Sequence, residues 1–197
     1  MNLEPIILAS GSSRRQDFFK LLGLPFNVMP AVIDEDLSAS KDPEKLTCEI
    51  AGKKIEKVIH DMRNRPPKWV CAADTVISLD EKIFGKPQNR DEAAVTLNEL
   101  SDKQHRAVTS IALYRASDKK IAYKSASCSV SFAKLSKGEI EWYLDTNEWQ
   151  GVAGAYRLQG LASCFITKIE GCPSTVVGLP LREFYVMLRN NGYHFGG

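Results

Sequence analysis

The sequence predicts an α/β protein built on a mixed, twisted sheet with flanking helices. Short apolar runs alternate with stretches of helical periodicity in the first half of the chain. Two long β-prone segments joined by a charged turn follow in the middle, a pattern typical of an antiparallel hairpin. A mixed sheet accounts for both observations better than a purely parallel one.

The chain begins with a predicted strand, loop and helix. Residues 5–9 form a short apolar strand, and residues 26–29 form a second one. The helix between them has Ser13 and Gln16 at the spacing of a capping box. Gly23 follows it and can adopt the left-handed conformation that ends helices.

The strongest helix prediction starts at Asp42, an N-cap residue followed by proline and by apolar residues at helical spacing. Residues 69–79 form the next strand, with Asp74 inside its apolar run. Asn89 caps a further helix that ends near Leu100. The remaining elements are expected as strands near 107–115 and 121–132, a helix opened by the capping box of Ser136 and Glu139, a glycine-rich loop at 149–160, a strand at 161–169, and a last helix from Pro180.

Composition limits the class of protein. The 197 residues, 44% of them hydrophobic, are predicted to form one domain spanning residues 1–197. Lys plus Arg total 26 against 24 for Asp plus Glu, which argues against a nucleic-acid-coating protein. No apolar run approaches the roughly 20 residues of a membrane span. Five cysteines without C-x-x-C spacing favour a reducing, cytoplasmic location over a disulfide scaffold or a zinc site.

The loop between the first strand and helix is the first candidate site. It runs from Ser10 to Ser13 and is followed at once by Arg14 and Arg15. Backbone N–H groups at a helix N-terminus and two guanidinium groups are suited to binding a polyphosphate. The alternative is an ordinary capped helix with two solvated arginines.

Charged residues in apolar surroundings are the second candidates. Asp74 interrupts a buried strand, which favours a functional carboxylate, although a structural ion pair is the alternative. Lys54 lies between Ile50 and Val58 on the helical wheel, where most lysines only extend to solvent. Lys86 follows a predicted strand and is either a ligand contact or an exposed turn lysine.

Two loops complete the candidate set. The acidic cluster Asp34-Glu35-Asp36, together with Asp74 and substrate phosphates, suits Mg²⁺ or Mn²⁺, although a solvated loop is the alternative. Gln159 lies in the glycine-rich loop, where an amide can bind a nucleobase edge through a donor and an acceptor, although an ordinary surface loop is the alternative.

Taken together, these residues resemble the Maf family of nucleoside triphosphate pyrophosphatases. The resemblance runs nearly end to end and depends on the order of seven stretches, at residues 8–15, 34–35, 51–54, 73–76, 85–87, 153–160 and 177–181. It implies an elongated fold related to that of inosine triphosphate pyrophosphatases, with a cleft between two lobes. A divalent metal and a homodimer are implied as well.

The resemblance also implies a reaction, hydrolysis of a nucleoside triphosphate between the α and β phosphates. Asp74 would be the general base or a metal-linked carboxylate, and Glu35 would assist the metal or the water. The triphosphate would be held by Ser10, Arg14, Arg15, Lys54 and Lys86.

Thr75 after the aspartate and Gln159 in the later loop resemble the subgroup acting on dTTP and UTP. The subgroup acting on 7-methyl-GTP typically has a tryptophan before the arginines, a glutamine after the aspartate, and a glutamate in the later loop. Four residues depart from the family pattern and leave the base preference open: Ser13, Ser110, Val152 and Arg157.

Two functions of other classes compete with hydrolysis. A nucleotide-binding regulatory protein without turnover would keep the pocket and lack activity. A nucleic-acid-binding module would use the basic stretch of residues 53–68, although no aromatic side chains are interleaved with it.

Overall fold

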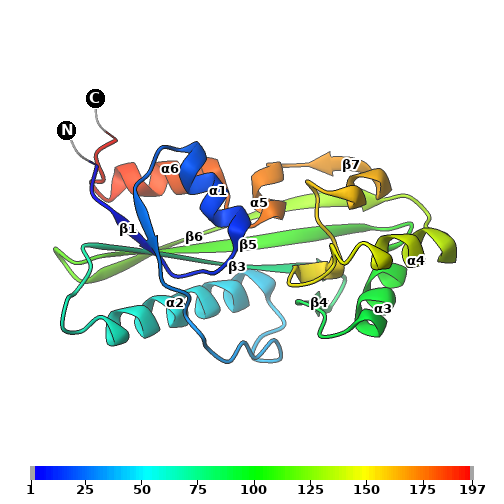
Figure 1. The fold of residues 1–197 in the computed structure, drawn as a ribbon, viewed down its shortest axis with the longest axis horizontal. Coiled ribbons are helices and arrows are strands. Elements are labelled where there is room, and N and C mark those ends of the chain that lie inside the picture. Colours follow the sequence, from blue (N-terminus) through cyan, green and yellow to red (C-terminus); the bar gives the residue numbers. More distant parts are fainter. Residues whose placement is uncertain (1–2, 196–197) are drawn as a thin grey trace.

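A seven-stranded mixed sheet forms the centre of the protein, as the sequence predicts. The computed structural model describes residues 3–195. The strands are β1 (Ile6–Leu8), β2 (Phe26–Val28), β3 (Trp69–Leu79), β4 (Lys82–Phe84), β5 (Gln104–Arg115), β6 (Lys120–Phe132) and β7 (Ile166–Glu170). Their order is β2-β1-β3-β5-β6-β7, and β4 pairs with β3. Figure 1 shows an elongated molecule in which β3, β5 and β6 run along the long axis.

The helices pack on both sides of this sheet. They are α1 (Ser13–Leu21), α2 (Pro43–Asp61), α3 (Arg90–Leu100), α4 (Lys137–Asp145), α5 (Pro173–Val177) and α6 (Leu181–Asn190), with 3₁₀ turns η1 (Ala153–Ala155) and η2 (Leu161–Phe165). In Figure 1, α2 lies on one side of the long strands, and α1 and α6 lie on the other. Within residues 3–195, no helix is both long and apolar enough to cross a bilayer.

The pairing of β3 leaves one part of its edge open. On that edge, β1 is parallel to β3 and pairs with Val70 and Cys71. Further along the same strand, β4 is antiparallel and pairs with Ile77, Ser78 and Leu79. In the part of the chain that the structure describes, residues 72–76 therefore have a strand partner only on the other side, in β5. The opening lies between two lobes, each built at one end of the long strands.

Strand alternation divides β3 between two helical layers. Val70 and Ala72 pack with α2, whereas Cys71 and Ala73 pack with α1 and α6. Because side chains of a strand alternate between faces, Asp74 continues the row that faces α2 and Thr75 the row that faces α1. Neighbouring residues of β3 therefore lie on opposite walls of the opening.

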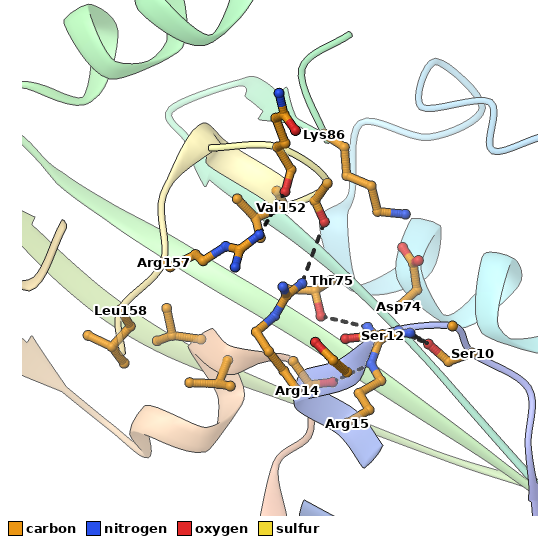
Figure 2. Close-up of a pocket in the computed structure, with 18 of the residues that line it drawn as sticks. Ser10, Ser12, Arg14, Arg15, Asp74, Thr75, Lys86, Val152, Arg157 and Leu158 are labelled. Atoms are coloured by element: carbon orange, nitrogen blue, oxygen red, sulfur yellow. Dashed lines mark hydrogen bonds between the residues drawn. The ribbon is translucent and has the colours of Figure 1, made fainter. Parts of the chain in front are cut away.

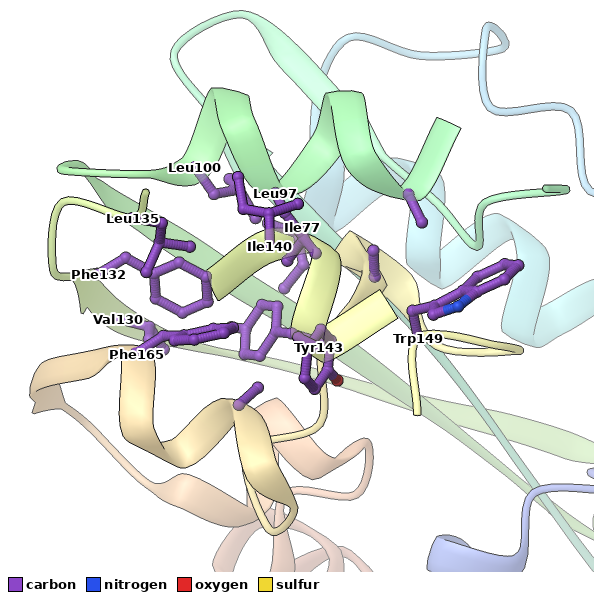
Figure 3. Close-up of a cluster of buried hydrophobic side chains, with 14 of the residues drawn as sticks. Ile77, Leu97, Leu100, Val130, Phe132, Leu135, Ile140, Tyr143, Trp149 and Phe165 are labelled. Carbon is purple, nitrogen blue, oxygen red and sulfur yellow. The ribbon is translucent and has the colours of Figure 1, made fainter. Parts of the chain in front are cut away.

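The first lobe contains the cores beneath α1, α2 and α6. Phe19 of α1 and Phe184 of α6 are fully buried, with ring centroids 5.2 Å apart. The second lobe has its own aromatic core, in which Phe132, Tyr143 and Phe165 pack beneath α3 and α4 (Figure 3). Separate cores in the two lobes, joined by continuous strands, explain the elongated shape.

The predicted boundaries differ from the structure at several places. Ser13 is the first helical residue of α1, and Ser12 is its N-cap without a side-chain cap bond, so the predicted Ser13 capping box is wrong. The strand predicted at 161–169 starts at Ile166, and η2 precedes it. Ala162 and Phe165 are buried three residues apart, which is the repeat of a 3₁₀ helix. The short helix α5 was not predicted, and β5 begins before residue 107.

Candidate active site

A cavity of about 440 Å³ opens at the unpaired part of the β3 edge. This volume lies in the usual range for sites that bind small molecules. Four segments distant in sequence contribute most of its walls: the loop from Ala9 to Arg15, Asp74 and Thr75 of β3, residues 150–159, and residues 176–178. Ala31, Glu35, Lys54 and Lys86 complete the lining. Figure 2 shows side chains from these segments directed into one space.

Lys54 lies between two carboxylates at one wall of the cavity. Its Nζ is 2.7 Å from Asp74 Oδ1 and 2.7 Å from Glu35 Oε1. Only 7% of the Lys54 side chain and 5% of the Asp74 side chain are exposed, so Lys54 is a buried ion-pair partner and does not extend to solvent. Opposite charges that are both removed from water offset one another's desolvation cost, and neither is tolerated alone.

Glu35 joins this pair to the mouth of the cavity. Its other carboxylate oxygen lies 3.2 Å from Lys86 Nζ, which is half exposed. Burial raises the pKa of Glu35, but its ion pairs with Lys54 and Lys86 outweigh burial and hold the pKa below the ordinary value. The carboxylate is therefore ionised at neutral pH. Of the predicted acidic cluster, only Glu35 lines the cavity, and Asp34 and Asp36 are exposed outside it.

Arg15 is buried in the opposite wall, and its hydrogen bonds define that wall. Nε donates to the Gly178 carbonyl at 2.7 Å, and the terminal nitrogens donate to Ser10 Oγ at 3.0 Å and Thr75 Oγ1 at 3.2 Å. Burial lowers the pKa of the guanidinium. Arg15 thus connects the α1 loop, β3 and the turn after α5. The Gly178 contact was not predicted, since a backbone carbonyl leaves no signal in the side-chain pattern.

Thr75 is fixed from a second direction as well. Its hydroxyl lies 2.9 Å from that of Thr109 on β5, which donates to the Thr175 carbonyl at 2.7 Å. Thr109 was not among the predicted residues, and the register of β3 with β5 places it directly opposite Thr75. The two strands therefore hold a rigid row of hydroxyls at the cavity wall.

The α1 N-terminus supplies backbone donors to the cavity. Ser12, Ser13 and Arg14 line it, and the Ser12 side chain makes no cap bond to the first turn. Ser10 Oγ accepts from the Ser12 N–H at 3.3 Å, which orders the loop. Unbonded N–H groups of a first helical turn, at the positive end of the helix dipole, favour an anion.

The remaining predicted residues lie along the outer part of the cavity. Arg14 reaches the Gly151 carbonyl at 3.5 Å, and Gln159 is an exposed residue of the lining. The cavity thus brings all nine predicted side chains together: Ser10, Arg14, Arg15, Glu35, Lys54, Asp74, Thr75, Lys86 and Gln159. Cations outnumber carboxylates in this set, so the site suits a polyanion.

Two carboxylates, Asp74 and Glu35, are the only acidic side chains among the cavity's lining residues that the structure describes. Within residues 3–195, no group of three or more His, Cys, Asp or Glu could hold a metal ion by itself. Mg²⁺ commonly binds to one or two carboxylates and completes its coordination with water and substrate phosphates. The donor chemistry of this pair fits such a cation in the presence of a phosphorylated ligand.

The chain is similar to known proteins along nearly its whole length. A model of the family described as Maf-like protein matches residues 5–191. A dTTP/UTP pyrophosphatase of Pelotomaculum thermopropionicum is 38% identical over 192 residues, which cover 98% of this chain and 99% of the relative. One of Desulforamulus reducens is 40% identical and covers 96% and 98%, and one of Fusobacterium nucleatum is 39% identical and covers 95% and 96%. This chain belongs to the Maf family.

Proposed function

We propose that the protein hydrolyses nucleoside triphosphates, dTTP and UTP above all, to the monophosphate and pyrophosphate. The observation that carries the proposal is the buried Asp74–Lys54–Glu35 group facing a cavity whose other walls hold arginines and a helix N-terminus. The names of relatives 37 to 40% identical over nearly the whole chain support the same reaction and substrates.

The arrangement separates binding from proton transfer. Arg14, Lys86 and the α1 N-terminus bind phosphate oxygens and stabilise the charge that develops on the pyrophosphate leaving group. Arg15 orders the loop that carries Ser10. Lys54 holds Asp74 through Oδ1, which leaves Oδ2 to accept the proton of the attacking water. Glu35 fixes Lys54 from the other side and orients the same water.

Asp74 and Glu35 would hold a divalent cation, Mg²⁺ or Mn²⁺. When bound, the cation would neutralise phosphate charge and lower the pKa of the attacking water, which would let a carboxylate act as its base. A metal titration with metal-stripped protein, scored by pyrophosphate release, tests this part of the proposal.

Two side chains support a pyrimidine substrate. Thr75 is fixed by Arg15 and Thr109, and Gln159 presents its amide at the cavity mouth. These are the residues that resemble the dTTP and UTP subgroup, whereas 7-methyl-GTP is the alternative substrate. Including 7-methyl-GTP in the assay distinguishes the two.

The proposal includes a single domain that acts in the cytoplasm as a homodimer, without membrane or nucleic-acid partners. The basic stretch of α2 is partly neutralised, since Lys57 pairs with Asp61 one turn further on. Light scattering of the purified protein tests the dimer, and salt-dependent DNA or RNA binding would contradict the absence of a nucleic-acid partner.

A nucleotide panel tests the activity itself. We expect pyrophosphate release from dTTP and UTP with Mg²⁺ or Mn²⁺, and Asp74→Asn to lower kcat by about 100-fold or more. Asp61→Asn removes a carboxylate from an exposed ion pair and should leave kcat unchanged. Equal activity of Asp74→Asn and wild type would contradict the mechanism. Tight nucleotide binding without hydrolysis would identify a regulatory binding protein instead.

A further inference from the structure

Arg157 belongs to the loop that closes one side of the cavity, and it has neutral partners only. One terminal nitrogen donates to the Gln150 carbonyl at 3.2 Å. Arg14 reaches the neighbouring Gly151 carbonyl, so both guanidinium groups approach the same turn (Figure 2). In the part of the chain that the structure describes, neither arginine has a carboxylate within ion-pair distance, whereas each guanidinium nitrogen of the nearby Arg15 donates a hydrogen bond.

The Nε of Arg157 is buried and has no hydrogen-bond partner among the described residues. A buried N–H on a charged group is costly to leave unpaired, so such donors are nearly always satisfied by protein, water or ligand. Arg157 lines the cavity, so the residue that carries this unused donor borders the ligand space. A shift of the guanidinium toward a bound hydrogen-bond acceptor would satisfy the donor.

The two arginines also repel each other. Burial, followed by the charges of Arg157 and Arg15, lowers the pKa of Arg14 to about 10. Arg14 remains cationic at neutral pH, and it lies in a partly desolvated place where like charges are poorly screened. An anion that bridges them would replace this repulsion with two charge-assisted hydrogen bonds.

We propose that Arg157 is a second phosphate-binding residue, which together with Arg14 holds the β,γ-pyrophosphate part of the substrate and the pyrophosphate product. This inference rests on the proposed function and extends its binding site to a residue outside the predicted set. The pyrophosphate part is chosen because it carries the highest negative charge of a nucleoside triphosphate, which matches two cations without counter-ions. The reacting α-phosphorus then lies nearer to Asp74 and Glu35.

The competing explanation is that Arg157 only braces the loop through Gln150. The two roles predict different results for inorganic pyrophosphate, which lacks the nucleoside. If Arg157 only stabilises the loop, its loss weakens the binding of every part of the substrate. If Arg157 binds phosphate, its loss weakens the binding of pyrophosphate itself. Lysine at this position keeps the positive charge but lacks the planar guanidinium. It therefore shows how much of an effect comes from the charge and how much from the hydrogen bond to the loop.

Calorimetric titration with inorganic pyrophosphate, without divalent metal, tests the proposal. We expect Arg157→Gln to weaken pyrophosphate binding about tenfold or more, and Arg157→Lys to retain part of the affinity. Arg65→Gln removes an exposed arginine of the loop after α2 and should leave the affinity unchanged. Pyrophosphate should also raise the melting temperature of wild type more than that of Arg157→Gln.

A double-mutant cycle measures whether Arg14 and Arg157 act on the same ligand group, which a purely structural role of Arg157 does not predict. If Arg14 and Arg157 bind one group, the losses in Arg14→Gln and Arg157→Gln are not additive in the double variant. Unchanged pyrophosphate affinity in Arg157→Gln, or wild-type protein that binds no pyrophosphate, would overturn the inference. The pyrophosphate titration measures binding without turnover, and the nucleotide panel measures hydrolysis without any change at Arg157. A failure of this inference can therefore be distinguished from a failure of the proposed function.

Discussion

Lys54 Nζ and Asp74 Oδ1 lie 2.7 Å apart, between the middle of a helix and the middle of a strand. Both side chains are almost completely buried. The contact exists because Lys54 occupies the apolar stripe of α2, and because alternation along β3 directs Asp74 toward that stripe. One ion pair thus fixes both the packing of α2 and the orientation of the proposed base.

Replacing Lys54 by methionine keeps the volume and removes the cation. Glu35 then loses the cation that contributes most to lowering its pKa, so protonation of Glu35 is favoured. We expect the acid limb of the pH-rate profile to move upward by about 1 to 3 pH units, with a lower kcat. Lys57 lies on the same helix and forms an exposed ion pair with Asp61, so Lys57→Met should leave the profile unchanged. An unshifted profile in Lys54→Met would contradict the coupling.

Arg15→Lys keeps the charge but loses the planar fork that reaches Gly178, Ser10 and Thr75. Lysine cannot make these three bonds in the same geometry, which leaves buried acceptors unpaired. We expect a loss of about 1 to 3 kcal/mol in the free energy of unfolding and a higher KM. Urea unfolding and steady-state kinetics measure the two effects. The exposed Arg63→Lys is the matched control, and equal stability of both variants would refute the structural role of Arg15.

His105 should make stability depend on pH. It is buried beside Tyr156, its Nδ1 has no partner within the described residues, and burial lowers its pKa to about 4. Between pH 4 and its ordinary pKa near 6.5, the unfolded chain binds the proton and the folded chain does not, so stability rises with pH there. The gain amounts to about 3 kcal/mol over that range.

His105→Gln removes this titration, and a flatter stability profile between pH 4 and 6.5 is expected from urea unfolding at several pH values. The exposed His60→Gln should keep the wild-type slope. The opposite ranking of the two variants would show that another group causes the dependence.

Gly154 lies in η1 with φ of +70°, and a Cβ there would clash with Ile77 Cγ1 on β3. Both the left-handed backbone and the clash oppose a side chain. We expect Gly154→Ala to lower the free energy of unfolding by about 2 to 4 kcal/mol and to disturb the adjoining cavity loop. Gly138→Ala on α4 meets nothing within 4 Å and should be neutral or slightly stabilising. Similar unfolding midpoints for the two variants would contradict this account.

The sequence was most informative where capping chemistry and long periodic runs agreed. Asp42 caps α2 through the N–H groups of Glu44 and Lys45, and Ser136 forms its predicted capping box with Glu139. The mixed sheet and the β5–β6 hairpin are confirmed for the same reason. Helix α5 was missed because it spans only five residues, too few for periodicity to appear.

In the site, the local sequence pattern identified the unusual side chains but not the residues that they contact. Asp74 was recognisable because it interrupts an apolar strand, and Lys54 because it lies in an apolar arc. The contact between Arg15 and Gly178 joins residues 163 positions apart and depends on tertiary packing. Likewise, Arg14 and Arg157 come close to each other only because the loop after α4 folds over the cavity.

The unbroken pairing of β3 with β5 restricts how the cavity can change its width. This ladder extends from Trp69 opposite Arg115 to Ser78 opposite Arg106, and so it crosses from one lobe to the other. Rotation of one lobe against the other would have to break or strongly bend it. We therefore expect substrate entry and product release to be governed by the segment carrying Gln150 to Gln159, while Asp74 and Thr75 keep their places on β3 through the cycle.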